Sequence, residues 1–146
     1  MNNDLAPVNC SASGSIELVG NNWLHMKLDT LLPSAKNNVG SRLVSNTITN
    51  LLNYYAAYHD NLPFYENAFV AIIEHCNYEN VSTYDHDNKG FRAVPNALKG
   101  RVFGDDNQFE MSLGLFTKQS QDEFYCEIYV LPMSDLSYFA LEYLIF

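Results

Sequence analysis

The sequence predicts a single α+β domain in which helices pack on a mixed β-sheet. Three observations lead to this fold class. The chain has 146 residues, which is the length of one domain, and 47% of them are hydrophobic, which is enough for a sizeable core. Segments with alternating and with helical hydrophobic periodicity follow one another without a repeat or a linker. We therefore expect strand, strand, helix, strand, helix, strand, strand and helix, in that order.

The beginning of the chain supports two expectations. Residues 1–13 are small and polar and show no period, so we expect a flexible leader there and the domain at residues 14–146. Hydrophobic residues then alternate on both sides of a Gly-Asn-Asn sequence at residues 20–22. This pattern predicts two strands joined by a tight turn, because Gly and Asn tolerate the positive φ that such turns need.

A helix and a buried strand are predicted next. Hydrophobic residues recur at spacings of three and four over residues 41–58, which predicts a core helix with Ser41 or Ser45 as its N-cap. The apolar run at residues 69–73 is bounded by turn signals and is typical of a buried central strand.

The second half of the chain predicts four more elements. Residues 93–102 are expected to be helical, with Pro95 in the first turn or at a kink. Alternation over residues 109–115 and again over 124–130 predicts a β-hairpin with one buried face. An apolar and aromatic stripe over residues 136–146 predicts a last short helix.

The charge balance limits the possible functions. The chain has 17 acidic and 8 basic residues, a net charge of −9. This argues against a protein that coats nucleic acid non-specifically, because Lys and Arg carry phosphate binding. However, half of the bases, namely Lys89, Arg92, Lys99 and Arg101, lie close together in the sequence.

The sequence also favours a cytoplasmic protein. It has no run of about 18 apolar residues and no basic and apolar start, so we expect neither a membrane span nor export. The three cysteines, Cys10, Cys76 and Cys126, are odd in number and far apart, which is typical of reduced thiols.

Two pairs of aspartates are the most informative feature. Asp85 and Asp87 are separated by one residue, and Asp105 and Asp106 follow the second predicted helix. Carboxylates that are brought together raise one another's pKa, and a divalent cation is the usual compensation. Donor sets of oxygen alone select hard cations, so these four residues are candidate ligands of Mg²⁺ or Mn²⁺. The alternative is that all four are solvated turn residues.

Calcium is a weaker alternative. The spacing from Asp85 to Gly90 resembles the start of an EF-hand loop. In that loop, however, Lys89 would stand in place of an oxygen donor and Asn96 in place of the bidentate Glu.

The same region resembles the signature of the RusA-type Holliday junction resolvases. That family has Asp-x-Asp-Asn, a helix ending in Asp-Ala-Leu, and Asp-Asp-x-Gln opening a hairpin. The matching stretches here are Asp85-His86-Asp87-Asn88, Asn96-Ala97-Leu98 and Asp105-Asp106-Asn107-Gln108, within residues 84–109. The order of elements is also similar. The resemblance implies a RusA-like fold and a homodimeric, Mg²⁺-dependent endonuclease that hydrolyses phosphodiesters in branched DNA, in DNA recombination and repair.

The resemblance also implies roles for individual residues. It makes Asp85, Asp87 and Asp106 catalytic metal ligands and Asp105 an auxiliary carboxylate. A Lys of the family falls on Phe91, or on Arg92 if one residue is inserted, so Arg92 is the remaining catalytic candidate.

The four clustered bases are expected to face the substrate. Phosphate binding is predicted for Lys89, Arg92, Lys99 and Arg101. The missing Lys and the acidic ends of the chain favour a second hypothesis. In that hypothesis the protein is a catalytically inactive RusA-like module of a mobile element or phage, which binds a protein partner.

Overall fold

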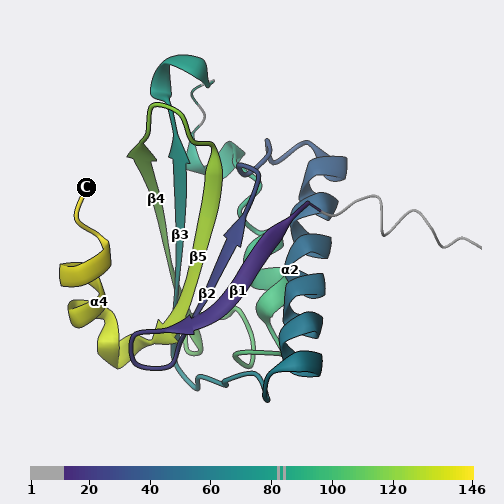
Figure 1. Ribbon diagram of the computed structural model, residues 1–146, viewed down its shortest axis with the longest axis vertical. Coiled ribbons are helices and arrows are strands. Elements are labelled where there is room, and N and C mark those ends of the chain that lie inside the picture. The colour runs from purple at the N-terminus through teal and green to yellow at the C-terminus, as the bar shows by residue number, and fades with distance from the viewer. Residues whose placement is uncertain (1–11, 82, 84) are drawn as a thin grey trace, which may run out of the picture.

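A five-stranded mixed sheet forms the centre of the protein (Figure 1). The computed structural model describes residues 12–81, 83 and 85–146, so most of the predicted leader lies outside the described residues. The strands are β1 (Gly14–Val19), β2 (Trp23–Leu28), β3 (Ala68–Cys76), β4 (Met111–Gln119) and β5 (Tyr125–Pro132), in the spatial order β1-β2-β5-β3-β4. Among the pairs that these described strands form, only β3–β4 is parallel.

The helices lie on both faces of this sheet, which confirms the predicted α+β class. They are α2 (Asn38–Tyr58), α3 (Ala93–Leu98) and α4 (Leu136–Tyr143), with short 3₁₀ turns at η2 (Tyr78–Asn80), η3 (His86–Asn88) and η4 (Met133–Asp135). In Figure 1, α2 and α4 stand on opposite sides of the strands. No helix in the described ranges is both long and apolar enough to cross a membrane.

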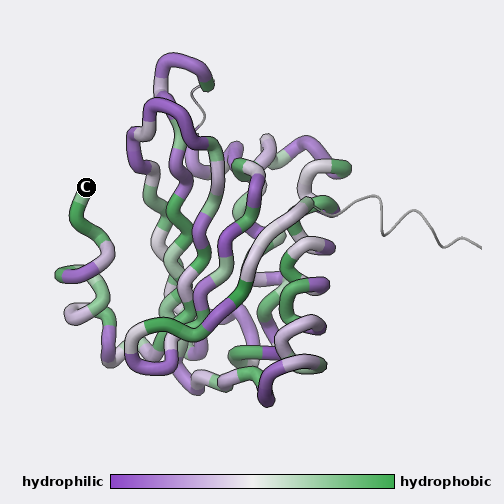
Figure 2. Tube along the Cα trace, viewed as in Figure 1, coloured by the Kyte–Doolittle hydropathy of each residue, from purple (hydrophilic) through white to green (hydrophobic). Residues whose placement is uncertain are grey.

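The alternation of side chains along the strands produces two cores. On one face of the sheet, Met26, Ile72 and Ile128 pack with residues of α2 and α3 such as Ile48 and Leu98. A smaller core on the other face joins α4 to the sheet, with members Trp23, Phe69, Ala71, Ile73, Tyr129, Leu131 and Phe139. Figure 2 shows the hydrophobic residues along the strands and helices, whereas the loops at the ends of the sheet are mostly hydrophilic.

The first two strands form the predicted hairpin. Val19 pairs with Trp23 and Gly14 with Leu28. The turn between the strands has positive φ at Gly20 (+56°) and at Asn22 (+63°), as the turn chemistry requires.

Helix α2 begins earlier than predicted, and the prediction of Ser41 or Ser45 as its N-cap is wrong. The cap is Asn37, whose side chain accepts a hydrogen bond of 2.9 Å from the backbone N–H of Gly40. Asn is as good an N-cap as Ser, and the polar first turn hid the true start because it has no apolar period.

The predicted hairpin of the last two strands is also wrong. Strand β3 lies between β4 and β5, and it pairs with both. All nine residues of β3 are buried, so this strand needs a neighbour on each edge. Residues 120–124 carry the chain past the end of β3, where the Ser120 N–H donates to the Cys76 carbonyl at 2.9 Å. Alternation reveals which face of a strand is buried but not which strand pairs with it.

Helix α3 is shorter than the predicted 93–102. It ends at Leu98, and Pro95 lies in its first turn. Gly100 follows with a φ of +76°, a left-handed conformation that interrupts the helix.

Candidate functional site

The Asp85–Asn88 motif lies in the connection between β3 and α3. Asp85 precedes the single turn of η3, and its carbonyl accepts a hydrogen bond of 2.9 Å from the Asn88 N–H. The side chains of Asp85, His86 and Asn88 are exposed. The side chain of Asp87 lies outside what the structure describes.

Backbone contacts tie this motif to the segment before α2. The Ala35 N–H donates to the Asn88 carbonyl at 2.6 Å, and the Gly90 N–H donates to the Pro33 carbonyl at 2.7 Å. Gly90 also fits closely, since a Cβ atom there would lie 3.1 Å from Pro33 Cγ. The motif is therefore held against the body of the domain.

Lys89 strengthens the same attachment. Its ammonium donates to the Leu32 carbonyl at 2.9 Å and lies 3.3 Å from Glu74 Oε2. Glu74 also accepts a hydrogen bond of 2.8 Å from the Leu32 N–H. The Lys89 ammonium, which the sequence predicts to bind phosphate, thus contacts the Leu32 carbonyl and the Glu74 carboxylate.

The second acidic pair lies in the turn before β4. The backbone N–H of Asp106 donates to Asp105 Oδ1 at 2.8 Å, and this hydrogen bond lowers the pKa of the Asp105 carboxyl. Lys99 Nζ lies 3.9 Å from Asp106 Oδ1, and both side chains are partly exposed. Lys99 therefore faces a predicted metal ligand, and Arg101 lies in the following turn.

The two acidic motifs flank the edge strand β4. His86 borders a small hollow together with Leu115 and Thr117 of that strand, whereas Asp105 and Asp106 shortly precede its first residue. Among the described side chains, no three His, Cys, Asp or Glu residues come together as metal ligands. The carboxylate donors suit Mg²⁺ chemically. The joint site of Asp85, Asp87, Asp105 and Asp106 stays a prediction, because Asp87 is needed to complete it.

A basic depression adjoins the first motif. It has a volume of about 570 Å³ and lies between the first turns of α2 and the start of α3. Its lining residues are Ala35, Ser41, Arg42, Ser45, Lys89, Gly90, Arg92, Ala93 and Asn96, none of them acidic. Arg42 and Arg92 are exposed, and neither forms an ion pair within the described part of the chain.

The sequence predicts Arg92 as a site residue but does not indicate Arg42. The two residues are 50 positions apart, as their numbers show, and only the packing of α2 beside α3 places them at one depression. In the sequence, Arg42 is a single basic residue among serines near the start of a helix, and such a pattern is too common to predict a binding site.

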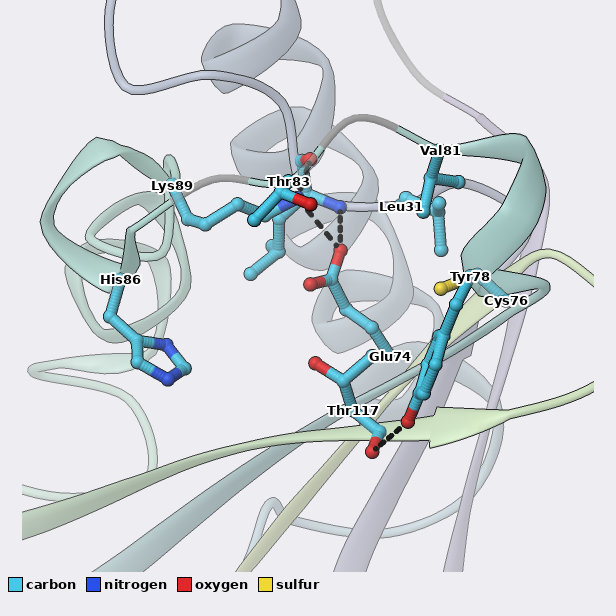
Figure 3. Close-up of a pocket in the computed structure, with 10 residues that line it drawn as sticks. Leu31, Glu74, Cys76, Tyr78, Val81, Thr83, His86, Lys89 and Thr117 are labelled. Carbon is cyan, nitrogen blue, oxygen red and sulfur yellow. Dashed lines mark hydrogen bonds and ion pairs between the residues drawn. The ribbon is translucent and has the colours of Figure 1, made fainter.

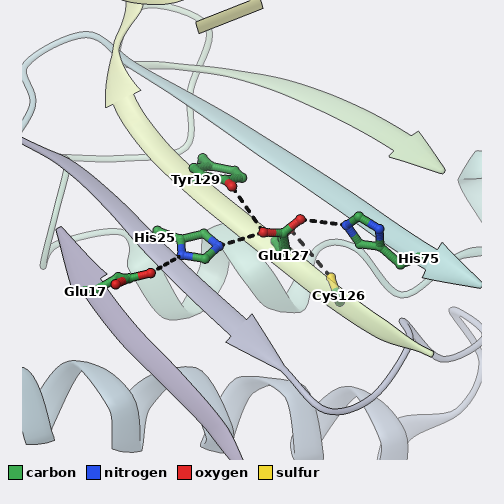
Figure 4. A network of polar contacts seen from close by, with 6 residues as sticks. All are labelled: Glu17, His25, His75, Cys126, Glu127 and Tyr129. Carbon is green, nitrogen blue, oxygen red and sulfur yellow. Dashed lines mark hydrogen bonds and ion pairs between the residues drawn. The ribbon is translucent and has the colours of Figure 1, made fainter. Parts of the chain in front are cut away.

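A second polar cluster, which no local sequence pattern predicts, lies on the α4 face of the sheet (Figure 4). Glu127 of β5 accepts hydrogen bonds from His25 Nε2 at 2.8 Å and from His75 Nε2 at 2.6 Å. The other ring nitrogen of His25 lies 3.0 Å from Glu17 Oε2, and the Tyr129 hydroxyl donates to Glu127 at 3.1 Å. We call these five residues the histidine network.

The electrostatics of this network require a charged His25. Both of its ring nitrogens face carboxylate oxygens, which accept but cannot donate, so both nitrogens must carry protons. Burial lowers the pKa of His25, but hydrogen bonds with Glu127 and Glu17 outweigh it and raise the pKa above 6.5. Burial likewise raises the pKa of Glu127, but the bonds from His25 and His75 dominate and lower it to about 2.

Comparison with known proteins adds no family to these observations. Neither models of protein families nor curated proteins match the chain. The basic depression and the two acidic motifs are therefore the features of the molecule that bear on its function.

Proposed function

We propose that the protein is a RusA-like, Mg²⁺-dependent endonuclease that hydrolyses phosphodiesters in branched DNA. The observation that carries the proposal is the acid-free basic depression beside the Asp-x-Asp turn. Lys89 links the two features, because it follows η3 and also lines the depression. We further propose that the enzyme acts in the cytoplasm as a homodimer.

The depression suits a DNA backbone. An arginine offers a planar fork of N–H donors that matches phosphate oxygens, and it keeps its proton at any physiological pH. In a chain of net charge −9, a surface that combines Arg42 and Arg92 with no acidic residue among its described lining residues is suited to an anion. A phosphate held there lies beside the turn that begins at Asp85.

The acidic motifs supply the proposed metal ligands. Asp85, Asp87 and Asp106 would hold the Mg²⁺ or Mn²⁺ ion, with Asp105 as an auxiliary carboxylate. Such an ion acidifies a water molecule and stabilises charge on a phosphoryl oxygen. The low pKa of Asp105 keeps that carboxylate ionised and available. Arg92 holds and orients the phosphate, since it cannot titrate as a general acid.

A second candidate function is that of an inactive interaction module. Phe91, at the position of the family's Lys, is partly buried and packs against the core, so this position cannot supply a charge. If Arg92 does not replace that Lys, the module would bind a protein partner of a mobile element or phage instead of cutting DNA.

Cleavage of synthetic four-way junctions tests the proposal. The wild-type protein should cut the junctions with Mg²⁺, whereas Asp87→Asn should lose activity by at least about 100-fold. Asp60→Asn is a matched control, because Asp60 is exposed and follows the C-terminal end of α2, whereas Arg42 lies near the N-terminal end of that helix. Wild-type protein that never cuts, with either metal, would exclude the nuclease.

Calorimetry distinguishes the two candidates without a DNA substrate. An enzyme should bind Mg²⁺ or Mn²⁺, and Asp85→Asn should weaken this binding while Asp60→Asn leaves it unchanged. Absence of metal binding together with absence of cleavage would favour the interaction module.

A further inference from the structure

A cavity beside the Asp85 motif has no role in the proposed hydrolysis (Figure 3). It has a volume of about 390 Å³ and lies between the C-terminal halves of β3 and β4 and the connection that carries η2 and η3. Glu74, Cys76 and Thr117 come from the strands, whereas Tyr78 and His86 come from the connection.

One buried carboxylate oxygen faces this cavity. Glu74 is only 9% exposed. Its Oε2 atom accepts a hydrogen bond from the Leu32 N–H and forms an ion pair with the Lys89 ammonium. No group in the described part of the chain donates to its Oε1 atom. A buried acceptor without a donor costs free energy, so a ligand that donates there is favoured.

The charge of the cavity favours a neutral ligand. Lys89 already neutralises Glu74, and a cationic ligand would have to compete with its ammonium. A neutral N–H donor can use Oε1 without disturbing this ion pair or the Leu32 hydrogen bond.

The walls of the cavity suit a planar ring. The Tyr78 N–H donates to Gln119 Oε1 at 3.0 Å, and its hydroxyl donates to the Thr117 carbonyl at 3.1 Å. The residue is thus held at its backbone and at the hydroxyl of its ring, yet it is 53% exposed. Figure 3 shows Tyr78 and His86 on opposite sides of the cavity, with Glu74 between them. Aromatic side chains that are held rigidly are good stacking partners for bases.

We propose that this cavity binds one unpaired nucleobase of the DNA substrate, which stacks on Tyr78 and donates an N–H group to Glu74. The proposal rests on the proposed nuclease function, because His86 stands between the two aspartates of the motif. Guanine is the expected occupant, since its Watson–Crick edge carries two adjacent donors, N1–H and N2–H₂. Thymine has one such donor, N3–H, and should bind more weakly than guanine.

The first test uses nucleosides and needs no cleavage. Saturation-transfer NMR with the full chain should detect deoxyguanosine more strongly than thymidine. Tyr78→Ala should abolish the signal and Tyr78→Phe should retain it, because Phe keeps the stacking face. Tyr58→Ala, at an aromatic residue on α2 that is 74% exposed, should bind like the wild type. Equal signals for all nucleosides, or an unchanged signal in Tyr78→Ala, would overturn the proposal.

The second test uses branched DNA. A junction with one unpaired guanine should bind about tenfold more tightly than the same junction with an abasic site there, in line with the stacking of one base. Glu74→Gln should remove the preference for guanine over thymine, and circular dichroism checks that this variant folds. Cleavage without nucleoside binding would refute the base pocket alone, whereas nucleoside binding without cleavage would refute the nuclease alone.

Discussion

Raising the pH from about 6 to about 9 should weaken the fold by removing the charge on His25. The perturbation acts on the histidine network, where His25 lies between Glu17 and Glu127. A neutral imidazole has one N–H, so it can donate to only one of the two carboxylates. The other carboxylate then faces a nitrogen lone pair.

The magnitude follows from the two contacts. The side chains of His25 and Glu127 are 12% and 17% exposed, and a hydrogen bond between charged groups with this burial contributes about 2 kcal/mol. The Glu17 side chain is 61% exposed, so its contact contributes less than about 1 kcal/mol. The neutral ring keeps one uncharged hydrogen bond, which contributes about 1 kcal/mol, so we expect a loss of about 1 to 2 kcal/mol in the free energy of unfolding.

The sign of the effect follows from the direction of the pKa shift. The folded-state pKa of His25 is raised above 6.5, so its contribution is complete below pH 6.5 and is lost as the pH rises through the folded pKa. The pKa of Glu127 is lowered from 4.5 to about 2, so its contribution is present above pH 4.5 and is lost as the pH falls towards 2. The network should therefore stabilise the protein most in mild acid.

Urea unfolding at several pH values measures this contribution. The difference in free energy of unfolding between the wild type and His25→Gln should be largest near about pH 6 and should shrink by about pH 9. The comparison removes the pH dependence of the groups that the two proteins share, including Lys27, which lies beside the network and over the Tyr125 ring. A difference that stays constant from mild acid to alkaline pH would refute the role of a charged His25.

Three further predictions concern the fold and the basic depression. Asn37→Ala should destabilise the protein by about 1 kcal/mol through loss of the α2 cap, measured by urea unfolding; an unchanged midpoint would show that the cap contributes nothing. Leu52→Ala should cost about 3 kcal/mol because Leu52 is fully buried, whereas Leu141→Ala, at a residue that is 74% exposed, should cost less than about 0.5 kcal/mol in the same assay. Replacing Arg42 and Arg92 by Gln should reduce the slope of log affinity for DNA against log salt by about 2, measured by fluorescence anisotropy; an unchanged slope would exclude phosphate contacts there.

Local patterns predicted most of the elements of this fold. The periodicities that place β1, β2, α2 and β3 arise from residues that are near one another in the chain. Boundaries were less accurate, because caps such as Asn37 and stops such as Gly100 carry no hydrophobic period. The pairing of β5 with β3 instead of β4 could not be read from alternation, which is the same for any partner.

The candidate site was predicted only in part, for the same reason. The Asp85 and Asp106 motifs are short and local, so the sequence reveals them as candidates. Arg42 became a candidate only when α2 was placed beside Arg92. The Oε1 atom of Glu74, to which no described group donates, is also invisible in the sequence, where Glu74 stands in an apolar strand with no sign of the groups that it meets.

The sequence by itself determined the α+β class and the order of the elements, and it indicated the candidate residues for binding metal or phosphate. Tertiary structure alone decided the order of the strands, the basic depression, the cavity at Glu74 and the histidine network. His25 and Glu127 are 102 residues apart in the chain, yet a hydrogen bond joins them. Periodicity depends on the geometry of one helix or strand, whereas such contacts depend on how separate elements pack, which no local pattern encodes.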